Sequence, residues 1–473
     1  MKILGSDEPR DQWEVSAGSS LGRCLIGHRV GEIVYLREGP LDELRYEILE
    51  IQSILVRAFQ ESLEHFGTLF PEDLALRKAE VRDGDVSSVL MMVAQSGIRA
   101  QELLSVYDTG YLTLEGLANL IGHHRYDVQR GLYTGEEHRL LCSIGSQEAQ
   151  QEENLWARQA TTVTMDLSTL ITLQQLGLLG KLSERFQTIF VPQQLLSELV
   201  LEMTERKSWK SKAKHTIGFR DGHWEFVDIP QDMIEDDMKR LNELLSFVRD
   251  HCHSVPVAIE HAGLMTDSMG RARLVGATSL ATLLVAQQQR IPLLADDLVL
   301  RSLGRGEYGC KGFWTLPLLS DLAERKFITS EEYRDACIRL IRTNHRYVPV
   351  TSEILLRAIR SSQSTDRDTY KVIHVLAGPD TTDSSAIPIA AEVLKVVYLD
   401  PALNERRSFI LGAMLASLIE GRMADKVIEL LLRRLTRIMH LEPLHLALAR
   451  GDIEAWHRVV APTLAPRSIG GLR

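Results

Sequence analysis

Four acidic residues occupy positions from which they could bind a metal ion. Asp166 directly follows a β-branched apolar run, and Asp296 and Asp297 directly follow a later one. Glu198 lies in the first turns of a helix expected after another such run. Clustered carboxylates suit Mg²⁺ or Mn²⁺, and such an ion can activate water for phosphodiester cleavage. Taken singly, each acid is more simply explained as a helix N-cap or a solvated loop charge.

A basic run begins about two helical turns after Glu198. It contains Lys207, Trp209, Lys210, Lys212, Lys214 and Arg220. Basic side chains neutralise phosphates and a tryptophan can stack on a base, a combination that suits single-stranded or looped RNA. The alternative is an ordinary solvated helix end.

The elements that must position these residues alternate between strands and helices. The β-rich runs are 162–165, 188–191, 224–229 and 292–295, and helical stretches separate them. This alternation is typical of an α/β fold with a parallel sheet covered on both faces. Ligands bind such sheets beyond the carboxyl ends of the strands, so we expect Asp166, Glu198 and Asp296 to meet at one edge.

Two segments resemble a PIN domain, and the resemblance runs from about 163 to 348. They read TTVTMDLSTLITLQQLGLLGKLSERFQTIFVPQQLLSELV and IPLLADDLVLRSLGRGEYGCKGFWTLPLLSDLAERKFITSEEY. The resemblance implies a ribonuclease that depends on Mg²⁺ or Mn²⁺ and has RNA as its substrate. It implies metal-binding roles for Asp166, Glu198 and Asp296, with Asp297 as an adjacent catalytic candidate.

The same resemblance implies three supporting residues. Ser168 or Thr169 would hydrogen-bond near Asp166 and orient it. Arg301, which follows the later acids, would contact RNA.

This sequence departs from the PIN pattern at one place. PIN domains often carry another acid at the start of the helix before the last of these strands, and Thr278 or Ser279 occupies that place here. Asp267 or Glu260 could substitute for it. One carboxylate fewer would weaken metal binding, which leaves a catalytically degenerate scaffold for binding protein or RNA as the alternative function.

The N-terminal segment resembles part of the C-terminal domain of Gre transcript cleavage factors. It reads VSAGSSLGRCLIGHRVGEIVYLREGPLDELRYEILEI, and the matching positions are Leu21, Gly22, Arg23, Gly27, Val30 and Gly31. The Gre coiled coil with its acidic tip has no counterpart, so the resemblance implies a truncated docking or packing module. Such a module combined with a PIN-like domain resembles bacterial conflict or defence proteins, which implies a toxin or antiviral effector.

Length and composition bound the remaining possibilities. The 473 residues predict roughly three domains. The pattern along the chain divides it into 13–66 (Gre-like), 67–160 (helical connector), 161–350 (PIN-like) and 351–473 (helical). The net charge of −10 argues against a dedicated nucleic-acid coat protein. The five scattered cysteines and the lack of a long apolar run predict a cytoplasmic protein with no membrane contact. Protein partners or a homo-oligomer could form through the helical regions.

Three further segments are interpreted as mainly structural. The stretch 112–132 has a faint helix-turn-helix pattern but lacks a basic recognition helix, which disfavours DNA binding. The sequence Asp250-His251-Cys252-His253 fits no common zinc spacing. The stretch 147–159 is polar and is interpreted as a linker.

Overall fold

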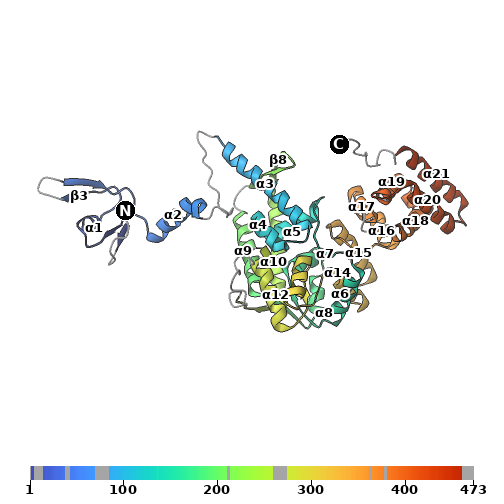
Figure 1. The fold of residues 1–473 in the computed structure, drawn as a ribbon, viewed down its shortest axis with the longest axis horizontal. Coiled ribbons are helices and arrows are strands. Elements are labelled where there is room, and N and C mark those ends of the chain that lie inside the picture. The colour runs from blue at the N-terminus through green and yellow to red at the C-terminus, as the bar shows by residue number, and fades with distance from the viewer. Residues whose placement is uncertain are drawn as a thin grey trace, which may run out of the picture. The chain divides into compact units, whose positions relative to one another are not determined.

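The computed structural model describes residues 2–4, 14–37, 43–69, 85–135, 137–209, 214–258, 274–361, 365–377 and 381–460. The chain divides into two compact units, Met1–Val89 and Leu90–Arg473, each of which is described by itself (Figure 1). The finer domain boundaries expected from the sequence stay predictions.

Among its described residues, the first unit contains short strands and two helices. Its elements are β1 (Lys2–Leu4), β2 (Glu14–Ser16), α1 (Ser20–Leu25), β3 (Ile33–Arg37), β4 (Glu43–Glu47) and α2 (Ile54–Leu69). Ser19 caps α1 by accepting a hydrogen bond from the Gly22 amide. Strands β3 and β4 pair antiparallel, and Val34 and Leu36 alternate inward along β3.

The second unit is built around a five-stranded, all-parallel sheet. The strand order is β11 (Gly312–Phe313), β10 (Leu293–Leu294), β5 (Thr162–Met165), β6 (Thr188–Pro192) and β9 (His253–Val255). Strand β5 is central: Thr164 pairs with Leu293 on one side and with Phe190 on the other. Buried positions dominate β5, β6 and β10, as in a sheet covered on both faces. The α/β expectation is confirmed.

The run 224–229 is a strand, but it does not join this sheet. It forms β8 (His223–Ile229), which pairs antiparallel with β7 (Lys214–Arg220) in a separate hairpin. The turn residues Asp221 and Gly222 both have positive φ, the conformation of the tight two-residue turns that join hairpin strands. Nearly every residue of β8 is exposed, so the strand lacks the apolar faces of a buried parallel strand. Strand β9 takes the edge position instead.

Helices surround the sheet and link it to the segment before it. They are α3 (Ser87–Asp108), α4 (Leu114–Ile121), α5 (Arg125–Thr134), α6 (Gln147–Gln159), α7 (Leu167–Leu176), α8 (Leu179–Arg185), α9 (Gln193–Trp209), α10 (Gln231–His251), α12 (Ala277–Gln289), α13 (Leu298–Glu307) and α14 (Thr315–Glu324). The linker interpretation of 147–159 is wrong. These residues form α6, which is capped by Ser146, buries Ala157 and packs on α14.

The C-terminal part of the second unit is entirely helical among its described residues. Its α-helices are α15 (Ser330–Arg342), α16 (Ser352–Arg360), α17 (Asp366–Ile373), α18 (Asp383–Leu399), α19 (Arg407–Ile419), α20 (Ala424–Ile438) and α21 (Pro443–Val459). Thr329 and Glu332 form a capping box at the start of α15. The helical content expected for 351–473 is confirmed among the described residues.

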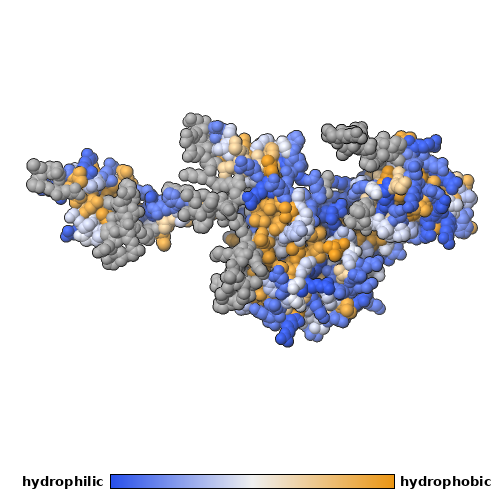
Figure 2. Space-filling view, in the orientation of Figure 1, coloured by the Kyte–Doolittle hydropathy of each residue, from blue (hydrophilic) through white to orange (hydrophobic). Residues whose placement is uncertain are grey.

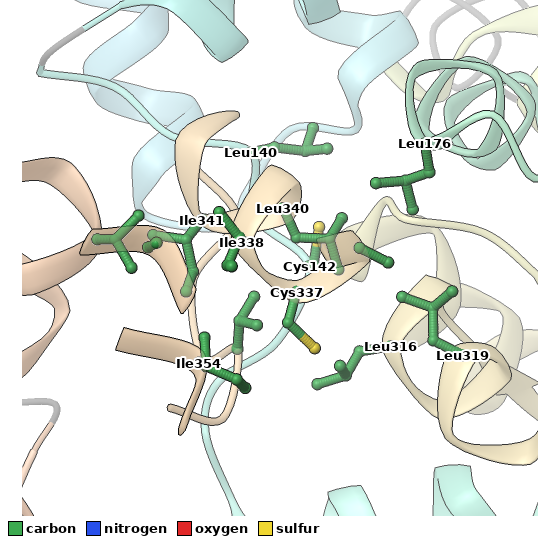
Figure 3. Packing of buried hydrophobic residues seen from close by; sticks show 14 of the residues in the cluster. Leu140, Cys142, Leu176, Leu316, Leu319, Cys337, Ile338, Leu340, Ile341 and Ile354 are labelled. Atoms are coloured by element: carbon green, nitrogen blue, oxygen red, sulfur yellow. The ribbon is translucent and has the colours of Figure 1, made fainter. Parts of the chain in front are cut away.

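One hydrophobic core runs from the sheet into these C-terminal helices. Figure 3 shows Cys337 and Leu340 of α15 between Leu319 of α14 on one side and Ile354 of α16 on the other. Figure 2 shows hydrophobic residues also gathering at the surface in the middle of the second unit, while hydrophilic residues dominate elsewhere in that view. No helix among the described residues is long and apolar enough to cross a membrane.

Candidate active site at the carboxyl ends of β5 and β10

Asp166 lies at the end of β5 and is held rigidly. It is the N-cap of α7, and its Oδ2 accepts hydrogen bonds from the amide and the hydroxyl of Ser168. Its Oδ1 accepts a hydrogen bond of 2.7 Å from Nη1 of Arg125. The Asp166 side chain is fully buried. Ser168 therefore has the orienting contact expected of Ser168 or Thr169, whereas the buried Thr169 hydroxyl has no hydrogen-bond partner among the described residues.

Glu198 reaches the same place from the second turn of α9. Its Oε1 and Oε2 accept hydrogen bonds from Nε and Nη2 of Arg125, at 3.2 and 3.0 Å. The Glu198 side chain is 20% exposed, so it lies on the solvent-accessible side of the site. Two of the predicted metal ligands thus meet, and one guanidinium lies between them.

Arg125 belongs to α5, in the segment before the sheet. It is 2% exposed, and its Nη1 also donates to the Ser279 hydroxyl at 3.1 Å. The face of α5 that carries Arg125 also buries Tyr126, Gln129 and Leu132. Helices α4 and α5 do form the helix pair suggested by the pattern in 112–132. Because α5 turns this face inward, it is not displayed for the major groove of DNA.

Glu115 of α4 places a carboxylate beside Thr278 and Ser279, the positions at which PIN domains often carry an acid. Its Oε1 accepts a hydrogen bond from the Thr278 amide at 3.0 Å, and its Oε2 accepts one from the Ser279 amide at 2.6 Å. Oε2 also lies 3.6 Å from Nη1 of Arg125. An acid from another segment therefore caps α12 and faces the same cluster. The substitutes considered from the sequence, Asp267 and Glu260, lie outside the described residues.

The close approach of Glu115 depends on Gly276. This residue has a φ of 91°, and a Cβ added to it would lie 2.1 Å from Cδ of Glu115. A side chain at position 276 would therefore be strained in its backbone and would collide with the carboxylate.

Asp296 and Asp297 both serve as caps. The Asp296 oxygens accept hydrogen bonds from the amide and the hydroxyl of Thr315, at 2.8 Å each, at the start of α14. Asp297 accepts from the Leu300 amide at 3.1 Å and from the Leu114 amide at 2.6 Å. Asp297 therefore ties the start of α4 to the sheet edge, while the carboxylate of Asp296 is directed to Thr315.

Burial and charge set the pKa values of this cluster. Burial would lower the pKa of Arg125, but Asp166, Glu198 and Glu115 outweigh that effect and raise it. Burial raises the pKa of Glu115, against the lowering effect of Arg125. Burial also raises the pKa of Asp297 to about 6, against hydrogen bonds from two backbone amides. Three carboxylates around one guanidinium leave the cluster short of positive charge whenever all three are ionised.

The donor set suits a hard divalent cation in its chemistry, because its ligands are carboxylate oxygens. The spacing of these carboxylates, however, does not suit one. In the described part of the chain, no three acidic, histidine or cysteine side chains are grouped closely enough to bind an ion.

The basic run behind α9 is only partly described. Lys207 is exposed in the last turn of α9, and Arg220 is exposed beside Asp221 at the β7–β8 turn. Lys210 and Lys212 lie outside the described residues, and of Lys214 only the backbone in β7 is described. Trp209 lies under the Arg206 guanidinium, 3.9 Å from the ring centre.

Arg301 is not placed for contact with RNA. It is 5% exposed, and its guanidinium donates to Glu153 and to the carbonyls of Ala295 and Cys142. These contacts fix the end of β10 against α6. The expected RNA contact is therefore replaced by a structural role.

Comparison with known families agrees with the fold around the parallel sheet. Residues 164–306 match a family described as a PIN domain associated with the TPR-GreAB-C-PIN system. Residues 164–306 therefore form a domain of the PIN type. Its match begins in β5 and ends in α13, so Asp166, Glu198, Asp296 and Asp297 lie inside it, whereas Glu115 and Arg125 lie before it. No curated protein and no solved structure matches the chain. The Gre-like interpretation of the N-terminal segment stays a prediction, because the match does not include it.

Proposed function

We propose that this protein is an endoribonuclease that depends on Mg²⁺ or Mn²⁺ and acts as a toxin or antiviral effector. One observation carries the proposal: Asp166, Glu198 and Glu115, which come from three separate helices and strand ends, converge on one guanidinium. Buried acids of like charge are costly to bring together unless cations compensate them. PIN domains are generally nucleases, which agrees with a cation-binding function for such a cluster.

Each residue of the site would have a separate role in binding the ion. Asp166, held by Ser168, and Glu198, on the more exposed side, would be the principal metal ligands. Glu115 would supply the acid that positions 278 and 279 lack. Asp296 would be a further ligand at the sheet edge, and Asp297 beside it would add charge. When bound, the ion would activate water and stabilise the anionic transition state of phosphodiester cleavage.

RNA would approach from the open side of Glu198. Lys207 lies further along the same helix and is exposed, so it could neutralise a phosphate. Lys210, Lys212 and Lys214, which follow it in the sequence, would extend this contact. Trp209 already contacts Arg206, so its stacking on a base would require that pair to separate.

Asp166→Asn tests the nuclease proposal. The amide keeps the shape of the side chain but removes the charge that would hold an ion. We expect the variant to lose RNA cleavage and the thermal stabilisation that excess Mn²⁺ gives the wild type, because a ligand stabilises only a fold that binds it. Circular dichroism would check that the fold is intact. Unchanged cleavage and an unchanged response to Mn²⁺ would overturn the proposal.

The position of Arg125 favours a second candidate. A PIN domain that has lost its catalytic activity could retain a buried arginine paired with the acids. In that case the helical regions would bind a protein partner. Expression in cells separates the two candidates. A toxic wild type beside a harmless Asp166→Asn variant supports the effector, whereas equal behaviour of both supports the interaction module.

A further inference from the structure

The atoms that Arg125 contacts are those an ion would need. Its Nη1 lies 2.7 Å from Oδ1 of Asp166, and its Nε and Nη2 engage both oxygens of Glu198. The other oxygen of Asp166 already accepts two hydrogen bonds from Ser168. An ion bound by both Asp166 and Glu198 would therefore have to replace the guanidinium at these carboxylate oxygens.

Electrostatics makes joint occupancy unfavourable. A guanidinium and a divalent cation a few ångströms apart repel strongly in a buried site, where the effective dielectric constant is low. Arg125 is 2% exposed, so water cannot screen that repulsion. The guanidinium also adds only one positive charge to its three carboxylate neighbours. A divalent ion would compensate the same carboxylates better.

We infer that Arg125 is a tethered competitor of the metal ion, carried into the site by the α4–α5 helix pair. This inference rests on the proposed function. The arginine holds Asp166 and Glu198 together while the ion is absent, and ion binding requires it to leave. The contacts of Arg125 with Asp166 and Glu198 define a closed state, in which these acids are satisfied from within the chain.

Contacts outside the acid cluster hold α5 in that closed state. His124, directly before Arg125, lies 2.8 Å from Glu202 and contacts Glu205, both on α9. Further along α5, Asp127 pairs with Arg206 of α9, and Arg130 pairs with Asp237 of α10. The helix that carries the competitor is thus attached to the helix that carries Glu198.

The test is the affinity for Mn²⁺ alone, measured by calorimetry on the full chain. We expect Arg125→Gln to bind Mn²⁺ roughly tenfold more tightly than the wild type, within the range of coupled binding equilibria. Mn²⁺ should also raise the melting temperature of Arg125→Gln more than that of the wild type. An arginine with a merely structural role would give a lower melting temperature without tighter binding.

Two other variants complete the experiment. Arg185 is also buried, and it pairs with Asp321 and with the Ala157 carbonyl away from the acids. Arg185→Gln should therefore destabilise the fold but leave the Mn²⁺ affinity at the wild-type value. If Arg125→Gln does not fold, Arg125→Lys keeps the charge and loses the two-pronged contact with Glu198, and it should still bind Mn²⁺ more tightly than the wild type.

The outcomes separate the inference from the proposed function. One outcome would overturn the inference and leave the nuclease proposal standing. In it, the wild type binds Mn²⁺, Asp166→Asn abolishes this binding, and the Arg125 variants bind Mn²⁺ equally or more weakly than the wild type. Absence of Mn²⁺ binding in the wild type and in all Arg125 variants would overturn both. Tighter binding by the Arg125 variants alone supports both.

Discussion

Glu115 and Arg125 bring opposite charges into the PIN domain from a segment that the family match does not include. Glu115 does so through two backbone amides, and Arg125 through two carboxylates and a hydroxyl. Each has a separate measurable consequence, because the first supports the start of α12 and the second connects α5 to β5 and α9.

Glu115→Ala should destabilise the second unit. The change leaves the amides of Thr278 and Ser279 buried without their acceptor, which costs about 1–3 kcal/mol per unsatisfied group. Urea denaturation at neutral pH would measure the loss. Glu148, exposed in the first turn of α6, provides the control, and Glu148→Ala should stay within about 0.5 kcal/mol of the wild type. Equal midpoints for the two variants would contradict the capping role.

Asp166 and Glu198 could be predicted from the sequence as acids of the site, whereas Glu115 and Arg125 could not. Asp166 and Asp297 follow apolar runs directly, and parallel sheets gather such residues at one edge. Arg125 is 41 residues from Asp166 and 73 from Glu198 along the chain, and no local pattern marks such a distant pairing. Glu115 lies 163 residues from Thr278. The one signal in the sequence is that Arg125 shares a helix face with residues such as Leu132, where a charged side chain is unexpected.

At the scale of elements, α5 and α9 are joined by ionisable side chains whose charge depends on pH. Hydrogen bonding to Glu202 raises the pKa of His124 to about 9, against burial that lowers it, and Glu205 contributes in the same direction. A histidine whose pKa is raised above its ordinary value of 6.5 stabilises the fold while it is protonated. That contribution is fully present below pH 6.5 and is lost as the pH rises through about 9.

His124→Gln should therefore reduce stability in a pH-dependent way. The difference in unfolding free energy from the wild type should be largest near pH 6 and should shrink towards pH 9 and above, because the wild-type histidine is then neutral. Denaturation curves across this range would measure it. His440, which is exposed and contacts the Arg437 carbonyl, provides the control: His440→Gln should show little dependence. A constant difference for His124→Gln would contradict the charged contact.

Two elements differ from their sequence interpretation for reasons visible in particular residues. The 224–229 run has the composition of a strand, but Asp221-Gly222 is a strong hairpin signal, and it pairs the run with the preceding residues. The polar 147–159 stretch lacks an apolar period, yet Arg301 and Arg305 pair with Glu153 and Glu152 and hold it as a helix. Long-range ion pairs of this kind are not readable from periodicity.

At the scale of the whole molecule, the PIN sheet and the C-terminal helices share one core, and the second unit should unfold as one. Ile354 of α16 is 3% exposed within this core. Ile354→Ala should cost about 2–5 kcal/mol and should lower amide protection in β5 and α19 together. Hydrogen exchange followed by mass spectrometry would measure both. Loss of protection confined to the C-terminal helices would show that the two parts unfold separately.

Gly276 has a consequence for how this chain can change over evolutionary time. Any side chain at position 276 would exclude the carboxylate of Glu115, so the two positions cannot vary independently. A chain that gained a side chain at 276 would need a new cap for α12 and a different neighbour for Arg125. The segment before the PIN domain and the PIN domain itself are therefore structurally matched at this contact. Transferring this PIN domain without the α4–α5 pair would remove both the Glu115 carboxylate and the Arg125 guanidinium from its site.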